Sequence, residues 1–160
     1  MTTPFNFSAG AVLTAAQLNE IGKYYAYTPT WGSITPGSGG AAAVSDAMYA
    51  QVNKVVHASG TLTFGSGTAI TGNVTMSLPF TAADAETAAN GCKFGFYDAS
   101  TTVYYQGAGR TSSTSAVFVY AWNAAGTYVS LSDIADNTKP FPATWTTGDK
   151  IIFNIVYEAA

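Results

Sequence analysis

Charged residues are scarce in this sequence. Only 9% of its 160 residues are Asp, Glu, Lys or Arg, whereas ordinary globular domains have about 25%. The six basic residues are spread singly and the formal net charge is −3, so no basic cluster neutralises phosphates and nucleic-acid binding is not expected. Sparse charge removes the repulsion between copies, and 14% aromatic residues supply surface to bury. Both favour a permanent assembly over the alternative, a weakly charged secreted domain.

Cysteine and histidine occur once each, as Cys92 and His57. A single cysteine excludes an intrachain disulfide, and one residue of each type excludes multi-thiolate and multi-histidine metal centres. We expect Cys92 to be a small buried hydrophobe. His57 alternates onto the polar side of its strand, where we expect it to be solvated or hydrogen-bonded. A catalytic pair of the two would need an orienting third group, and the sequence identifies none.

Enzyme signatures are also missing, including the Walker, GxSxG and HExxH motifs. The glycine groups at 37–40 and 65–67 lack the following lysine and helix of a phosphate loop, and they predict turns. Asp133, Asp136 and Asp149 lack the spacing of a calcium loop, so we expect solvated turn carboxylates. The sequence therefore predicts no catalytic residue, no metal and no cofactor.

No apolar run approaches the ~20 residues that a membrane helix needs. The first residues, MTTPFNFSAGAVLTAAQL, have no positively charged start and only a short apolar segment. We expect a chain that is neither membrane-bound nor exported by a cleaved signal.

Short alternating strands dominate what is present. Residues 52–80 contain two runs in which apolar and polar residues alternate, joined by a loop rich in glycine. This pattern predicts a β-hairpin of half-buried strands. Further strands are predicted around Trp31 and Ile34, within 41–56, and at 92–98, 102–106, 116–122, 127–131 and 150–157, with a helical turn within 81–91. Residues 27–160 are thus expected to form an all-β domain, an antiparallel β-sandwich of jelly-roll type.

A short arm and helix are predicted ahead of this domain, in residues 1–26. Thr14 and Gln17 form a capping box at the start of a short helix. This segment is expected either to pack on its own domain or to attach it to a partner or to sister subunits. The candidate attachment and oligomer-interface residues are Phe5, Phe7, Leu13, Leu18, Ile21 and Tyr25.

Two predicted strands are apolar on both faces. In residues 150–157, Ile152 and Val156 lie opposite the face that carries Phe153, and residues 118–122 read FVYAW. A second apolar face needs cover. We expect subunit contacts about a symmetry axis, with a homotrimer favoured. The alternative is that the N-terminal helix covers this face within one chain.

Aromatic residues on short strands or loop edges suggest one binding hypothesis. They are Tyr97, Tyr104, Tyr105, Trp122, Tyr128 and Trp145. Aromatic rings beside Asp, Asn and Gln can stack on sugars while the polar groups hold hydroxyls. The loops at 98–102, 105–115 and 132–148 are the expected place for such a site. The candidate glycan or receptor contacts are Tyr104, Tyr105 and Trp145.

Two segments carry a family resemblance. They read AGAVLTAAQLNEIGKYYAYTPTW at 9–31 and KVVHASGTLTFGSGTAITGNVTMSLP at 54–79. Together they resemble a family of bacteriophage structural proteins, in which an LTAAQLN-type helix leads through a Y-TPTW motif into a β-domain with a G-T-L-T-F-G-S-T hairpin and an N-V-T-x-S-L-P strand. The turn at 37–40 is richer in glycine than the G-N-G-T type usual there, and from residue 81 onwards the match is only general.

The resemblance implies a virion protein made in the host cytoplasm. It would be a capsid decoration protein or a tail or fibre component, with the N-terminal segment as attachment and the β-domain outward. Its partners would be itself and other virion proteins. The alternative is a receptor- or carbohydrate-binding module of a tail appendage that recognises a glycan of the host surface. The family has no catalytic motif to transfer.

Overall fold

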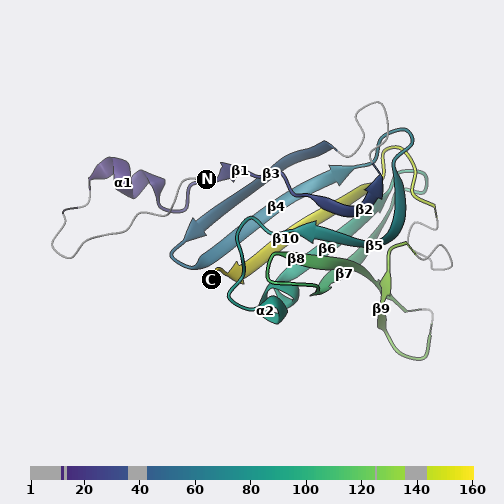
Figure 1. The fold of residues 1–160 in the computed structure, drawn as a ribbon. Helices are drawn as coiled ribbons and strands as arrows, with labels where there is room; N and C mark the ends of the chain where they lie inside the picture. The colour runs from purple at the N-terminus through teal and green to yellow at the C-terminus, as the bar shows by residue number, and fades with distance from the viewer. Residues whose placement is uncertain (1–11, 13, 36–42, 125, 136–143) are drawn as a thin grey trace.

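The computed structural model describes residues 12, 14–35, 43–124, 126–135 and 144–160 (Figure 1). Of the predicted attachment residues, Phe5, Phe7 and Leu13 lie outside this range, as does Asp136. In the described part of the chain, the helices are α1 (Ala15–Glu20) and α2 (Ala85–Asn90). The strands are β1 (Tyr25–Ala26), β2 (Trp31–Thr35), β3 (Ala43–Val52), β4 (Val55–Thr63), β5 (Ala69–Ser77), β6 (Cys92–Asp98), β7 (Val103–Thr111), β8 (Ala116–Asn123), β9 (Ser130–Asp133) and β10 (Lys150–Glu158).

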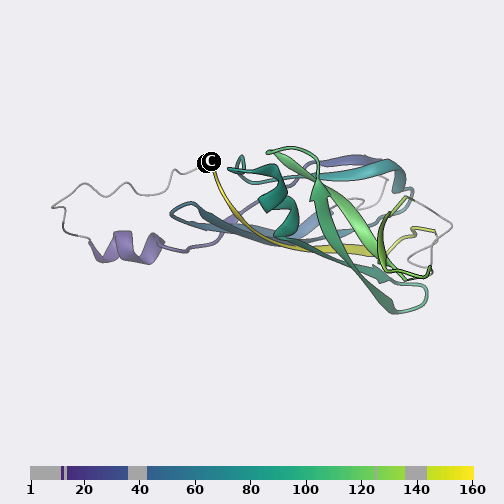
Figure 2. The ribbon, with the colours of Figure 1, turned by 90° about the horizontal axis from the view of Figure 1, so that it is seen from below.

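The strands form one curled sheet. Its order is β1-β3-β4-β10-β6-β7-β8-β5-β2, and β9 pairs with β8 beside this path (Figures 1 and 2). Every pairing among the described strands is antiparallel. The prediction of an antiparallel all-β chain is confirmed.

The predicted hairpin between β4 and β5 is wrong. β4 pairs with β3 and β10, whereas β5 pairs with β8 and β2. The tight hairpin lies one strand earlier, where Val52 pairs with Val55 and Asn53 takes a positive φ of 53° in the turn. After β4, the chain turns and crosses to the other end of the sheet. The Thr68 hydroxyl closes this turn by accepting from the Gly65 N–H at 3.0 Å.

Residues 27–30 connect the two edges of the sheet. β1 pairs with β3 at one edge and β2 pairs with β5 at the other, although only four residues separate β1 from β2. The Tyr27 N–H donates to the Ala47 carbonyl at 2.9 Å on the first side. On the second side, the Ser77 N–H donates to the Thr30 carbonyl at 2.9 Å. The sheet must therefore curl until its edges approach each other.

The core lies on the inside of this curl. Alternate residues of each long strand point into it, as the sequence pattern predicts for half-buried strands. Rings from distant strands meet there: Trp31 of β2 lies edge-on to Phe153 of β10 with centroids 6.1 Å apart. The largest fully buried side chains are Phe64, Phe94, Phe96, Phe153, Leu62, Met76, Ile134, Ile151, Ile155, Val56 and Val74.

Helix α2 confirms the helical turn expected within 81–91. Asp84 caps it, because its carboxylate accepts from the Thr87 N–H at 2.9 Å. The helix buries Ala88 and Ala89 as it packs against β7 and β10. Neither described helix has the length and apolar character needed to cross a membrane.

Cys92 is buried, as predicted, and its thiol donates to the Ala88 carbonyl at 3.1 Å. Burial raises the pKa of this thiol to about 12. Burial also raises the pKa of Tyr27 to about 12 and raises the pKa of Tyr157. All three groups stay neutral in the folded protein at a pH where the unfolded chain ionises.

Alkaline pH should therefore destabilise the fold. The unfolded thiol ionises near pH 8.5, so its contribution to stability is complete below that value and is lost as pH rises toward about 12. Between pH 8 and 10.5 the wild type should lose about 2 kcal/mol more of unfolding free energy than Cys92→Ala does. Urea titrations of both proteins at the two pH values measure this difference, and equal losses would contradict the assignment.

Candidate functional site

Helix α1 lies apart from the sheet in both views (Figures 1 and 2). Leu18 of α1 and Ile21, the residue directly after it, are about half exposed, with 52% and 46% of their surfaces accessible. The helix therefore does not cover the outer face of the sheet within one chain, which was one of the two predicted arrangements. The uncovered side is instead available to a partner.

Glu20 links the end of α1 to the strand that follows. Its carboxylate accepts from the Lys23 ammonium at 2.8 Å and from the Tyr25 hydroxyl at 2.7 Å. The hydrogen bond from Lys23 lowers the pKa of Glu20, and the bond from Tyr25 adds to this effect. Tyr25, a predicted interface residue, is half-buried, and its ring centroid lies 5.7 Å from that of Tyr49.

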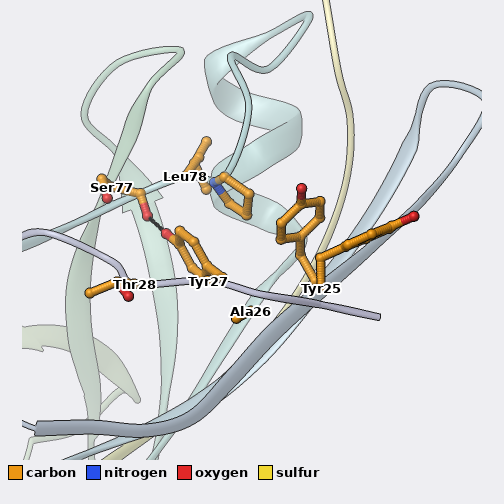
Figure 3. Close-up of a pocket in the computed structure, with 8 residues that line it drawn as sticks. Tyr25, Ala26, Tyr27, Thr28, Ser77 and Leu78 are labelled. Carbon is orange, nitrogen blue, oxygen red and sulfur yellow. Dashed lines mark hydrogen bonds between the residues drawn. The ribbon is translucent and has the colours of Figure 1, made fainter. Parts of the chain in front are cut away.

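A hollow of about 480 Å³ lies at the root of this segment (Figure 3). Tyr27 points across it, and its hydroxyl donates to the Ser77 carbonyl. Burial holds this phenol neutral, so it remains a donor. The lining is mostly aromatic and aliphatic and carries no charged group, so it suits packing and does not suit acid–base chemistry. It consists of Tyr25, Ala26, Tyr27, Thr28, Tyr49, Ser77, Leu78 and Pro79.

His57 confirms the expectation of a hydrogen-bonded histidine. Its Nδ1 lies 2.8 Å from the Tyr24 hydroxyl, and its Nε2 lies 3.1 Å from the Asn154 amide nitrogen. Both ring nitrogens are therefore engaged. The contacts fasten the segment after α1 to the outer face of β4 and β10.

The three predicted glycan contacts are not brought together. Tyr104 is 65% exposed on the outer face of β7, whereas Tyr105 turns inward and is half-buried against the core. Trp145 is buried, its ring stacks on Phe64 with centroids 4.8 Å apart, and its indole N–H donates to the Ile134 carbonyl at 3.0 Å. The expectation that Trp145 is exposed is wrong, because its large ring fills the core at one end of the sheet.

Tyr97, which belongs to the wider set of predicted sugar-stacking aromatics but not to the three candidate contacts, is the neighbour of Tyr104. The two ring centroids are 4.8 Å apart on the outer face. Strand β6 alternates buried Cys92, Phe94 and Phe96 with Lys93, Gly95 and Tyr97 on the other side. This alternation is visible in the sequence and would have placed Tyr97 outward.

The turn carboxylates are held by the chain itself. Asp98 accepts from the Ser100 hydroxyl at 2.7 Å and from the Ser100 and Thr101 N–H groups, and the Ser100 hydroxyl is the main cause of its lowered pKa. Asp149 is fully buried, so the prediction of a solvated carboxylate is wrong for it. Among the residues that the structure describes, no three His, Cys, Asp or Glu side chains group to hold a metal.

No family model matches the chain, and neither a curated protein nor a solved structure is significantly similar to it. Two surfaces of the protein therefore bear on its function. These are the uncovered side of α1 and the outer face of the sheet, which is the side opposite the core.

Proposed function

We propose that this chain is a non-enzymatic structural protein of a bacteriophage virion. It is a capsid decoration protein or a tail or fibre component, fastened through its N-terminal segment with the β-domain outward. The uncovered apolar side of α1 carries this proposal, together with the sequence resemblance of residues 9–31 and 54–79. Because about half of each side chain is already covered, burying Leu18 and Ile21 against a partner would contribute about 1 kcal/mol for each.

We also propose that the curled sheet is a sandwich of jelly-roll type. In such a sandwich, strands β1-β3-β4-β10-β6 form one layer and strands β7-β8-β5-β2 form the layer that faces it. The contact of Trp31 in β2 with Phe153 in β10 supports this division, because those strands lie far apart in the sheet order.

A homotrimer is the proposed assembly. The outer face has exposed apolar side chains on separate strands, with 48% of Val156 in β10 and 47% of Trp122 in β8 accessible. Contacts between copies would cover them, as expected for a chain with few charges. Light scattering on the purified full chain should give three times the chain mass of 16.6 kDa. A monomer at micromolar concentration would remove the trimer from the proposal.

Incorporation into particles tests the attachment role. Purified virions of the phage that encodes the chain should contain it by peptide mass spectrometry. The double variant Leu18→Asp, Ile21→Asp should enter particles at least tenfold less than the wild type when supplied in trans, because two carboxylates would have to be buried. Its melting temperature should be unchanged, since Leu18 lies on a helix apart from the sheet, Ile21 directly follows that helix, and both side chains are exposed.

Val129→Asp is the matched control, because Val129 is 63% exposed and lies outside α1. It should enter particles like the wild type. Absence of the chain from purified virions would overturn the proposal, and undiminished incorporation of the double variant would overturn the role of α1.

A further inference from the structure

On the outer face, β10, β6 and β7 pair side by side, and two rows of residues run across them. The register places Ile152, Gly95 and Gln106 in one row across the three strands. The next row along consists of Lys150, Tyr97 and Tyr104. Both rows face away from the core, because Phe94 and Phe96 of the same strand are buried on the other side.

Because Gly95 has no side chain, a gap separates the side chains of Lys93 and Tyr97 on this face. We name this gap the dip, and close packing does not require a glycine there. A Cβ on Gly95 would meet nothing nearer than Ile152 Cβ at 3.9 Å and the Tyr105 carbonyl at 4.0 Å. By contrast, a Cβ on Gly60 would lie 2.7 Å from Phe153, and one on Gly107 would lie 2.1 Å from the Tyr120 carbonyl. Glycine weakens a strand interior, and it often marks a bulge, a tight bend, or a place where a ligand or another backbone approaches closely.

Two aromatic rings border the dip. Tyr97 follows Gly95 on the same face, and Tyr104 lies beside it with ring centroids 4.8 Å apart and planes inclined by 39°. Tyr104 remains 65% exposed, so its ring offers a face to solvent. Exposed aromatic faces beside hydrogen-bonding groups, here the Gln106 amide, suit the apolar faces and hydroxyls of sugars.

Two cations flank the dip along its length. Lys93 precedes Gly95 on the outer face, and Lys150 pairs with Tyr97, with its ammonium 5.9 Å from that ring centroid. Neither lysine forms an ion pair with a carboxylate of the described residues. The nearby Asp98 carboxylate is occupied by Ser100 and Thr101. In a chain of net charge −3, this local positive charge favours an anionic ligand.

We propose that this face binds a carboxylated saccharide, such as a uronic or sialic acid unit of a glycan. The sugar ring lies over Gly95 and against Tyr97 and Tyr104, Gln106 bonds its hydroxyls, and its carboxylate lies between Lys93 and Lys150. A protein partner fits less well, because lysines are depleted at the centres of protein interfaces. The site uses neither α1 nor the hollow beside it, so its test is separate from that of virion attachment.

Calorimetric titration of the full chain tests the site with defined probes. Trigalacturonate, trimannuronate and sialyllactose are the carboxylated saccharides, maltotriose is the neutral one, and triglutamate supplies charge without sugar. At least one carboxylated saccharide should bind, more tightly than maltotriose and triglutamate and less tightly at higher salt. Failure of all three, or equal binding of maltotriose or triglutamate, overturns the proposal.

Two variants locate the binding. Tyr104→Ala should weaken it about tenfold, a loss in the range expected for one stacking contact. Gly95→Gln should abolish it by filling the dip. Tyr128→Ala is the matched control, since Tyr128 is 84% exposed and lies outside β10, β6 and β7. Unchanged saccharide affinity in Tyr104→Ala would overturn the placement of the site on this face. An equal loss of affinity in Tyr104→Ala and Tyr128→Ala would also overturn it. Both results can be read even if Gly95→Gln does not fold.

Discussion

Phe153→Ala is expected to lower the free energy of unfolding by about 4 kcal/mol, the scale of a buried phenylalanine lost from a core. The Phe153 side chain is 1% exposed. Its ring meets Trp31 at 6.1 Å and Tyr27 at 6.4 Å between centroids, both edge-on. Tyr27 belongs to the segment that connects the two edges of the sheet, and Trp31 begins β2 directly after that segment. The substitution therefore removes packing where the curl closes, in addition to leaving a cavity.

Chemical denaturation followed by tryptophan fluorescence measures the loss, since Trp31 reports from the same contact. Phe118→Ala is the matched control, because Phe118 lies half-buried on the outer face and contacts Tyr120 at 6.2 Å. Its loss should stay near 1 kcal/mol, as expected for partial burial. Equal losses in the two variants would mean that Phe153 does not hold the curl closed.

The strands were predictable because each long strand is buried on one side. Strand β6 begins and ends at the predicted residues 92 and 98, where the alternation is regular and Gly91 and the turn after Asp98 bound it. β7 runs five residues past the predicted end at 106, because Gly107 and Gly109 look like turn residues in the sequence. In the fold both glycines pack closely against neighbouring backbone, where a side chain would clash.

Strand pairing was not predictable from the same pattern. Alternation shows which side of a strand is buried, but it does not identify the strand that pairs with it. The loop between β4 and β5 contains Gly65 and Gly67, the usual residues of a hairpin turn. Here that turn starts a passage to the far end of the sheet. Asn53 makes the actual hairpin turn, and a lone asparagine beside Lys54 is a weak signal.

The candidate surfaces were predictable in part. The apolar side of the N-terminal helix was predicted, and Leu18 in α1 and Ile21 directly after it are exposed. The prediction about Trp145 was wrong because its surroundings, residues 144–149, show no alternation that separates buried from exposed positions. The row of Tyr97 and Tyr104 depends on the register between β6 and β7, which is a property of the folded sheet.

Asp149→Ala is the second substitution with a large expected effect. The side chain of Asp149 is fully buried, and its two carboxylate oxygens accept from different parts of the chain. Oδ1 accepts from the Ala99 N–H at 2.8 Å, and Oδ2 accepts from the Thr146 N–H at 2.6 Å. It thus joins the turn after β6 to the turn before β10. Removing it leaves two backbone donors without their acceptor, so the unfolding free energy should fall by about 3 kcal/mol.

Asp84→Ala and Asp149→Asn are the controls. They test whether the loss in Asp149→Ala comes from its two buried hydrogen bonds or from the removal of an aspartate as such. Asp84 is exposed and accepts one backbone N–H at the start of α2, so its loss should be about 1 kcal/mol. Asp149→Asn keeps one acceptor but turns an amide N–H₂ toward the second donor, so its loss should lie between the two. Denaturant titrations give all three values. A loss in Asp149→Ala no larger than in Asp84→Ala would show that water replaces the carboxylate, and the two turns would then be joined chiefly by their backbone.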